Sequence, residues 1–278
     1  MIKIFNEDCF RTMCNTPAGS FDIILTSPFY NTNKKAGKTR TLSNVSVKSN
    51  QYDYVRYDAH IDCMSNEEYC NFTERLFLNF DRVLKTDGVI LYNINYGAEN
   101  SEGMFLAINS ILTATPFTIA DVIVWKKSNA IPNNCSSNRL TRIWEFVFVF
   151  CRKKELKSFT CNKAVKSHRS TGQAMYENVF NYIEAKNNDE VCPYNKATYS
   201  TELCKKLLSL YAIKDKRISV YDPFMGSGTT AVACKELGFD CIGSEISENQ
   251  CRWARERLLR YTLSKLNIAK QKKMEVMK

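Results

Sequence analysis

Histidine, and the cysteine motifs of several enzyme classes, are scarce or missing in this sequence. Only two histidines occur, His60 and His168, so a histidine-centred catalytic triad or metal site has almost no material. The twelve cysteines form no Cys-x-x-Cys pair, which favours reduced core residues over a zinc or dithiol site. There is no Pro-Cys dipeptide, the usual context of a cysteine nucleophile for methylation at cytosine C5, and no zinc-deaminase signature. We therefore expect no bound metal.

Long apolar runs are also missing. No stretch approaches the roughly 18 apolar residues that a membrane helix needs. Met1 leads directly into the strand-like Ile2–Phe5, with no signal-peptide pattern before it. The 278 residues, 44% of them hydrophobic, suffice for one large α/β domain with a buried core. We expect a single domain spanning 1–278 in a soluble, cytoplasmic protein without membrane association.

Positive charge is concentrated rather than spread along the chain. The formal net charge is +10. Residues 31–50 carry five Lys/Arg and no acid, 151–170 carry seven against one acid, and 249–278 carry nine against two. Such concentration favours a polyanion partner such as nucleic acid, although a solvated lysine-rich surface is the alternative for the last segment.

Strand-like and helix-like runs alternate along the chain. With Ile2–Phe5, the predicted strands are Phe21–Thr26, Val89–Ile94, Ile119–Trp125, Trp144–Cys151, Ile218–Tyr221 and Asp240–Ser244. The predicted helices are Glu67–Leu84, Met104–Leu112, Leu203–Tyr211, Thr229–Leu237 and one capped by Ser247 that runs towards Leu266. The alternation predicts a Rossmann-like α/β fold, with a mostly parallel seven-stranded sheet and helices on both faces. Segments 31–64 and 152–190 are polar or basic and irregular, as functional loops often are.

A glycine turn follows one predicted strand. Asp222-Pro223-Phe224-Met225-Gly226-Ser227-Gly228 leads from Ile218–Tyr221 into the helix beginning at Thr229. The glycines allow a ligand to approach the backbone, and the helix N-terminus offers free N–H groups. No Gly-Lys-Ser/Thr follows, so this is not a phosphate-binding loop. Asp222 suits the ammonium of an amino-acid-like ligand. Glu245, after the next strand, suits ribose hydroxyls, so the pattern predicts nucleoside binding.

A second candidate segment, Ser27-Pro28-Phe29-Tyr30, directly follows the buried strand Phe21–Thr26. An aromatic amine is a poor nucleophile because its lone pair is delocalised into the ring. The Ser27 hydroxyl and the Pro28 carbonyl could accept the amine hydrogens and direct the lone pair at a methyl donor. Tyr30 could stack on a base rotated out of a duplex. A strand-ending turn with core aromatics is the plain structural alternative.

Both segments resemble motifs of the S-adenosylmethionine (SAM)-dependent amino-group DNA methyltransferases. Ser27–Tyr30 is similar to their Ser/Asp/Asn-Pro-Pro-Tyr catalytic motif, with Phe29 in place of the second proline, and 222–230 resembles their SAM-binding motif. The catalytic motif comes first, as in the circularly permuted β-group. Segments 6–9, 84–89, 142–150 and 196–203 resemble further family elements, so the resemblance covers most of the chain.

The resemblance implies a set of site residues. For SAM they are Asp8, Cys9, Thr198, Ser200, Asp222, Pro223, Phe224, Gly226, Ser227, Gly228, Thr229 and Glu245. For catalysis they are Ser27, Pro28, Phe29 and Tyr30. In the basic segments we expect phosphate contacts from Lys34, Lys35, Lys38, Arg40, Arg152, Lys153, Lys154, Lys166 and Arg169, with 31–64 and 152–190 as candidate target-recognition segments.

Serine at position 27 resembles the cytosine-N4 members, whereas aspartate is commoner in the adenine-N6 members. The resemblance thus favours methyl transfer to N4 of cytosine in a specific duplex DNA sequence, with adenine N6 as the alternative. It allows a cognate restriction endonuclease and a homodimer. An RNA methyltransferase, or a non-catalytic SAM- or DNA-binding module in view of Phe29, are the other readings. A nicotinamide dehydrogenase is disfavoured by the short glycine pattern and by Asp222.

Overall fold

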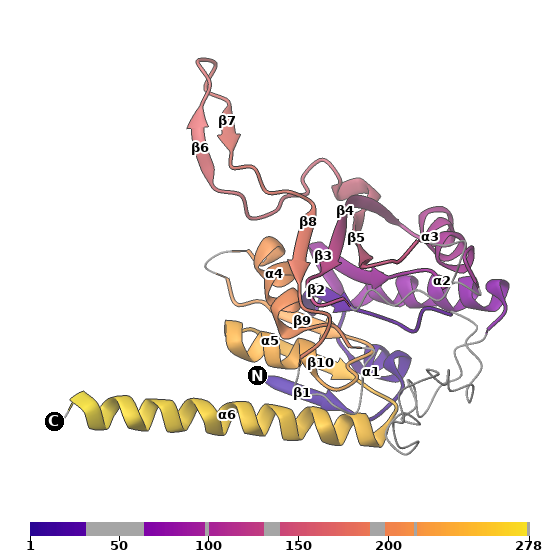
Figure 1. The fold of residues 1–278 in the computed structure, drawn as a ribbon. Coiled ribbons are helices and arrows are strands. Elements are labelled where there is room, and N and C mark those ends of the chain that lie inside the picture. Colours follow the sequence, from indigo (N-terminus) through magenta and orange to yellow (C-terminus); the bar gives the residue numbers. More distant parts are fainter. Residues whose placement is uncertain (32–63, 98–99, 131–139, 190–197, 214–215, 277–278) are drawn as a thin grey trace.

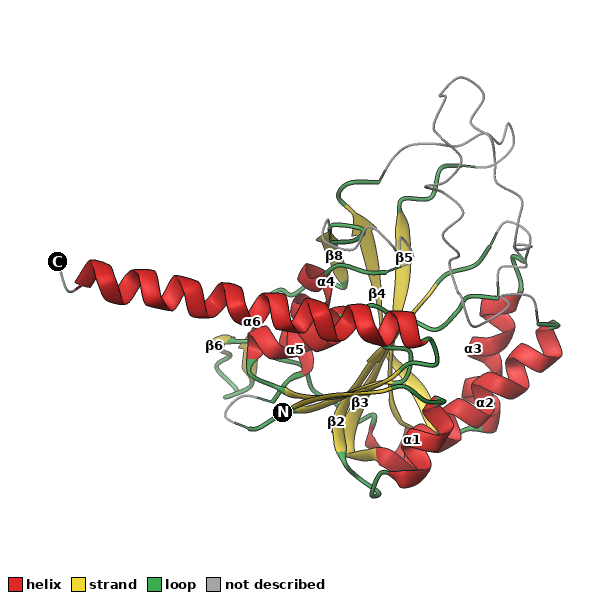
Figure 2. Ribbon diagram, turned by 90° about the horizontal axis from the view of Figure 1, so that it is seen from below, coloured by secondary structure: helices red, strands yellow, loops and turns green. Residues whose placement is uncertain are grey.

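The computed structural model describes residues 1–31, 64–97, 100–130, 140–189, 198–213 and 216–276, which form one large sheet with helices on both faces (Figures 1 and 2). The strands are β1 (Ile2–Phe5), β2 (Phe21–Thr26), β3 (Leu84–Ile94), β4 (Phe117–Lys127), β5 (Trp144–Arg152), β8 (Tyr182–Ala185), β9 (Ser219–Asp222) and β10 (Asp240–Ser244). Their order in the sheet is β1-β10-β9-β2-β3-β5-β4-β8. Only β5 is antiparallel to its neighbours, so the mostly parallel sheet is confirmed.

The predicted number of seven strands is wrong by one. The additional strand, β8, lies within the segment 152–190 that the sequence marked as irregular. It pairs in parallel with the end of β4, from Val124 opposite Tyr182 to Lys127 opposite Ala185. Four residues with alternating burial are too short to stand out as a strand pattern. The free edge of β4 supplies the main-chain partners that form this strand.

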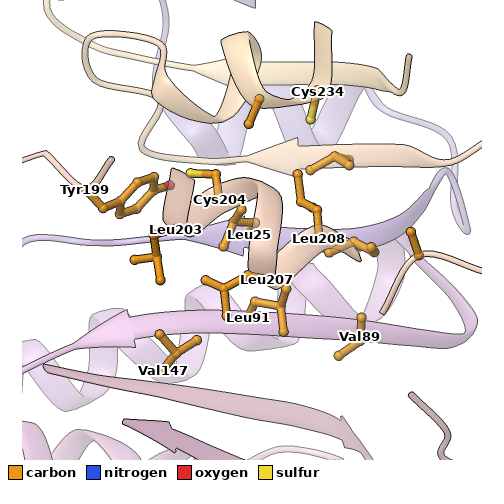
Figure 3. Close-up of a cluster of buried hydrophobic side chains, with 14 of the residues drawn as sticks. Leu25, Val89, Leu91, Val147, Tyr199, Leu203, Cys204, Leu207, Leu208 and Cys234 are labelled. Atoms are coloured by element: carbon orange, nitrogen blue, oxygen red, sulfur yellow. The ribbon is translucent and has the colours of Figure 1, made fainter. Parts of the chain in front are cut away.

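Two sets of helices cover the two faces of the sheet. On one face, α4 (Thr201–Tyr211) and α5 (Thr229–Leu237) pack over a core in which the leucines of α4 meet Leu25 of β2 and Leu91 of β3 (Figure 3). On the other face lie α1 (Cys9–Asn15), α2 (Asn66–Val83) and α3 (Gly103–Ala114), which bury a core rich in phenylalanine. The long α6 (Glu248–Val276) contacts α5 and β1 and then projects beyond the sheet (Figure 1).

Side-chain caps fix where several helices begin. Ser65 and Glu68 form a reciprocal capping box at the start of α2, within a residue or two of the predicted helix. The predicted cap Ser247 accepts from the Gln250 N–H at 3.2 Å, and α6 begins directly after it. The short α1 was not predicted, because seven residues carry little periodicity. Asp8 caps it by accepting from the Phe10 N–H at 2.7 Å.

The direction of the strands decides which residues share an edge. β1, β10, β9, β2 and β3 run the same way, so their carboxyl ends line one edge of the sheet. β5 runs the opposite way and returns the chain to the amino edge. From there the chain forms a short helical turn, η2 (Lys153–Glu155), and then a hairpin of β6 (Val165–His168) and β7 (Ala174–Tyr176), which projects from the body (Figure 1).

At the amino edge, the Asp22 carboxylate joins three strands. It accepts from the Ser219 N–H and hydroxyl at 2.9 and 2.7 Å and pairs with Lys85 at 2.7 Å and with Lys216 at 3.0 Å. Burial alone would raise the pKa of Asp22, but these donors lower it to about 2. Asp22 thus favours the folded state when it is ionised.

We expect Asp22→Asn to lower the free energy of unfolding at neutral pH by about 1–3 kcal/mol. Because the folded pKa lies below the unfolded one, the contribution of Asp22 is complete above about pH 4 and is lost as the pH falls towards 2. Urea unfolding of both proteins at several pH values measures this. The difference should shrink on acidification, and a difference that persists unchanged at pH 2 would contradict the assignment. Asp121→Asn, at an exposed position of β4, is the matched control.

Candidate active site

A glycine turn joins the carboxyl end of β9 to α5. Gly226 and Gly228 both adopt left-handed backbone conformations, with φ of 52° and 84°. A Cβ atom at position 228 would lie 2.7 Å from the Cβ of Ala254 in α6. Glycine is therefore required at position 228 both by its φ and by the close approach of α6. The turn brings backbone N–H groups and the start of α5 to the carboxyl edge of the sheet.

Asp222, the last residue of β9, is 1% exposed, and its carboxylate lies beneath the glycine turn, where several groups donate hydrogen bonds to it. One carboxylate oxygen accepts from the Thr26 hydroxyl at 2.9 Å and the Phe224 N–H at 3.0 Å. The other accepts from Thr230 at 2.5 Å and from the Tyr199 hydroxyl at 3.2 Å. Burial raises the pKa of Asp222, and its hydrogen bonds oppose this. With four protein donors on the carboxylate, Asp222 shapes the site rather than presenting a bare charge to a ligand ammonium.

The other predicted cofactor residues lie around the same edge. Glu245, just beyond β10, accepts from the Gly226 N–H at 2.8 Å and the Ser247 N–H at 2.9 Å, so it buttresses the glycine turn. Asp8 is exposed beyond the end of β1. Phe224 is partly buried, and Pro223 and Thr229 are buried. Within the described residues, the buried Ser227 hydroxyl has no hydrogen-bond partner, which leaves it available to a polar group of a ligand.

Three further cofactor predictions have different outcomes in the structure. Cys9 is buried, and burial raises the pKa of its thiol to about 12, so it contributes as a packed residue and through its carbonyl, which accepts from Tyr221. Ser200 is buried and its hydroxyl caps α4, accepting from the Leu203 N–H at 3.2 Å. Thr198 lies half-buried at the start of that segment. Sequence reasoning missed Tyr199 between them, which ties this segment to Asp222 and Thr230.

The Ser27–Tyr30 segment begins where β2 ends. The β2 strand pairs directly with β9, with Ile23 opposite Val220, and the Thr26 hydroxyl bonds Asp222. The ring of Phe29 lies 6.4 Å from the ring of Phe224, centroid to centroid. Residues 27–30 and 222–228 therefore meet at one edge of the sheet. This proximity is the geometric condition that the predicted two-part site requires.

Phe29, which replaces the family's second proline, is buried and fixed by α2. Its ring packs against Tyr69 and Phe72 at centroid distances of 5.4 and 5.1 Å. Its carbonyl accepts from the Tyr69 hydroxyl at 2.7 Å. Asn31 follows in a left-handed conformation, with φ of 48°, and its side chain donates to the Met64 carbonyl. Packing and hydrogen bonds thus give the segment the rigidity that a second proline would supply.

The Tyr30 hydroxyl is the centre of a polar cluster that the sequence did not reveal. It lies 3.0 Å from the Ser27 hydroxyl, 2.9 Å from the Asn93 Oδ1 of β3 and 2.9 Å from the Glu145 Oε2 of β5. Glu145 also pairs with Lys127 of β4 at 2.5 Å. The only sequence signal for Asn93 and Glu145 was a polar side chain inside an otherwise apolar strand.

The structure contradicts the phosphate contact predicted for Arg152. This side chain is 7% exposed and is used inside the protein, where it bonds Asp81 and the Leu84 and Lys85 carbonyls. Lys153 bonds the Leu112 and Thr115 carbonyls at the end of α3, and Lys154 is exposed beside it. Arg152 ends β5 and the two lysines follow it, so all three lie at the amino edge, opposite Ser27 and Asp222. The reversed direction of β5 is the physical reason that the prediction fails for Arg152.

Lys166 and Arg169 are exposed on the β6–β7 hairpin. The chain just before the hairpin is anchored by Asn162, which bonds the Leu210 carbonyl at the end of α4. Since α4 starts beside Asp222 and ends at the amino edge, the hairpin leaves the body on the side away from the two-part site. These two residues are therefore not brought to it. Lys34, Lys35, Lys38 and Arg40, with nearly all of segment 31–64, lie outside the described residues.

In the part of the chain that the structure describes, no three His, Cys, Asp or Glu side chains are grouped so as to hold a metal ion. Across the same residues, no helix combines the length and the apolar character needed to cross a membrane.

Comparison with known proteins gives one family. The profile of the N6 and N4 methyltransferases, described as DNA methylase, matches residues 21–256. The type II methyltransferase M.HinfI of Haemophilus influenzae is 24% identical over 271 residues, 92% of this chain and 67% of that protein. The type II methyltransferase M.SmaI of Serratia marcescens is 31% identical over 139 residues, which is 50% of this chain and 45% of that protein.

Solved structures share the fold. The PvuII DNA methyltransferase, described as cytosine-N4-specific, superposes with a TM-score of 0.66 at 14% identity and covers 91% of this chain and 85% of its own. The SAM complex of M1.HpyAVI superposes with a TM-score of 0.56 at 19% identity, covering 92% of this chain and 100% of its own. At these identities the similarity establishes the fold alone.

Proposed function

We propose, since this chain belongs to the DNA methylase family of N6 and N4 methyltransferases, that it transfers a methyl group from SAM to an exocyclic amine of a base in duplex DNA. One observation carries the proposal. The strand ends that bear Ser27–Tyr30 and the glycine turn pair directly through β2 and β9, and Thr26 bonds Asp222 between them. A donor held by one strand end thus faces an acceptor held by the other.

The residues at the glycine turn fit SAM. The left-handed glycines admit a ligand to the backbone, Phe224 offers an apolar surface to an adenine ring, and the exposed Asp8 follows β1, two strands from β9 in the sheet. The Ser227 hydroxyl is an unused donor in the turn. One carboxylate oxygen of Glu245 accepts from the Gly226 N–H and so fixes the conformation of the turn that would bind the nucleoside. SAM, when bound, supplies a methyl group activated by its sulfonium charge.

The Ser27–Tyr30 segment would receive a base rotated out of the duplex. The Ser27 hydroxyl and the Pro28 carbonyl would accept the two amine hydrogens, which turns the nitrogen lone pair towards the methyl donor. The half-buried Tyr30 ring would stack on the base. The rigid Phe29 anchor holds these groups in place before the base arrives. No metal is needed for this step.

We assign the target base as cytosine, at N4, because the segment begins with serine. Adenine N6 is the second candidate. The relatives M.HinfI and M.SmaI are type II methyltransferases, which supports a specific recognition sequence and a cognate restriction endonuclease as partner. We further propose that the protein acts in the cytoplasm and forms a homodimer.

Mass spectrometry of nucleosides tests the activity and the target base together. Duplex DNA incubated with protein and SAM is digested, and we expect N4-methylcytosine to accumulate in it. Single-stranded DNA and RNA serve as parallel acceptors and should gain little. N6-methyladenine alone would replace cytosine by adenine as the target. If no acceptor gains a methyl group although the protein binds SAM, the proposed activity is wrong.

A further inference from the structure

A chain of hydrogen bonds leads away from Ser27 into the protein. The Ser27 hydroxyl lies 3.0 Å from the Tyr30 hydroxyl, and this lies 2.9 Å from the Glu145 Oε2. The other carboxylate oxygen of Glu145 lies 2.5 Å from the Lys127 Nζ. The side chain of Glu145 is 13% exposed and that of Lys127 20% exposed, so the pair is largely shielded from water. The chain thus ends on a nearly buried carboxylate.

The donors and acceptors along this series of hydrogen bonds can be assigned in only one consistent direction. The Asn93 Nδ2 donates to the Phe146 carbonyl, which leaves its Oδ1 as an acceptor facing Tyr30. An ionised Glu145 is also an acceptor only. The single hydroxyl proton of Tyr30 is therefore directed at Asn93 or Glu145, and Ser27 must donate to Tyr30. The remaining lone pairs of the Ser27 oxygen are then free to accept a hydrogen from a base amine.

We propose that Glu145 is the destination of the proton that the target amine loses, with Ser27 and Tyr30 as the path. This rests on the proposed function. As the amine nitrogen bonds to the methyl carbon, the carbon–sulfur bond breaks and its electron pair stays on sulfur. The nitrogen, now cationic, gives one proton to the Ser27 oxygen, Ser27 gives its own to Tyr30, and Tyr30 gives its own to Glu145. The base ends neutral and methylated, and the neutral Glu145 later returns the proton to water.

The same arrangement stabilises the developing charge before the proton moves. Two hydrogen bonds separate the Glu145 carboxylate from the Ser27 hydroxyl, which would accept a hydrogen of the reacting amine. The surroundings of the carboxylate hold little water. Its negative charge favours the cationic nitrogen over the neutral one, so it lowers the barrier to transfer. Glu145 acts through Tyr30 and Ser27 and is a positioning residue that does not touch the base.

The test compares Glu145→Gln with Glu184→Gln by single-turnover methyl transfer, with SAM and DNA binding measured separately. Glu184 is a matched control, since it also pairs with a lysine of β4 but is 49% exposed and lies on the edge strand β8. We expect Glu145→Gln to slow transfer by about 100-fold with both affinities unchanged, and Glu184→Gln to match the wild type.

The pH dependence separates this role from a merely structural one. Among described residues, the titratable groups hydrogen-bonded to Glu145 are Tyr30 and Lys127. The wild-type rate should fall on acidification, whereas the rate of Glu145→Gln should stay flat over the same range. Equal rates for the two proteins would overturn the proposal. So would a loss of SAM or DNA affinity that accounts for the slower transfer.

Tyr30→Phe removes the hydroxyl that links Ser27 to Glu145 and keeps the aromatic ring. This variant tests the proton path even if Glu145→Gln fails to fold. We expect a similar loss of rate, and no further loss in the double variant, because both changes break one path. A Tyr30→Phe rate equal to that of the wild type, or additive losses, would overturn the path. Failure of the proposed function looks different, because the wild type itself would then transfer no methyl group.

Discussion

Replacing Asp222 by alanine is expected to abolish SAM binding and to lower the free energy of unfolding by about 3 kcal/mol or more. The buried carboxylate accepts from Thr26, Tyr199, Thr230 and the Phe224 N–H. Alanine removes their shared acceptor, leaving the Tyr199 and Thr230 hydroxyls with their bond to each other, and it removes the contacts that give the glycine turn its shape. Loss of the turn removes the backbone surface on which we place SAM.

Calorimetric titration with SAM and urea unfolding measure the two effects of Asp222→Ala. Asp222→Asn is the informative control, because an amide keeps the shape and can still accept from Thr26 and Phe224 while donating to a hydroxyl oxygen. We expect the asparagine variant to fold with most of the wild-type stability and to bind SAM more weakly. If the alanine variant binds SAM as the wild type does, the Asp222 contacts do not form the cofactor site.

Replacing Ser27 by alanine should leave SAM affinity and stability nearly unchanged and slow methyl transfer by about 1,000-fold. The hydroxyl is half-buried and bonds Tyr30, so its loss costs little packing. What disappears is the acceptor for an amine hydrogen and the first member of the path to Glu145. The contribution of this hydroxyl to transfer is made only when a base is in place, so ground-state binding of SAM should not report it.

Radiolabelled transfer to duplex DNA and SAM titration on the same preparation test the Ser27→Ala expectation. Ser209→Ala, at an exposed position of α4, is the matched control and should behave as the wild type. A Ser27→Ala variant that transfers methyl groups at the wild-type rate would remove Ser27 from the chemistry. A variant that loses SAM binding as fully as Asp222→Ala would show that the two strand ends do not divide the work.

The sheet and its two decisive strand ends could be predicted because their signals are local. The run Phe21–Thr26 has a continuous apolar centre at residues 23–25, as a strand buried on both faces needs, and Gly226 and Gly228 mark a turn that few other residues can form. The meeting of the ends follows from the parallel direction of β2 and β9. Strand β8 escaped prediction, because a free sheet edge rather than its own four residues defines it.

The partners of Tyr30 could not be predicted, because they come from strands far away in the chain. Asn93 and Glu145 each stand in an apolar strand, and only the order β2-β3-β5 brings both to one hydroxyl. The phosphate contact predicted for Arg152 failed for a related reason. Charge along a sequence does not tell which edge of the sheet a lysine or arginine reaches, and the reversal at β5 carried Arg152 to the wrong one.

The pairing of β1 with β10 has a consequence for how this protein is made. Met1 and Asp240, which form an ion pair beside these strands, are 239 positions apart in the sequence. The paired strands β2 and β9 are separated by nearly as many residues. During synthesis the first two strands emerge long before the strands that lie between them in the sheet. Their open edges remain uncovered until the glycine-turn half is complete, so we expect slow folding and a need to protect the growing chain from premature association.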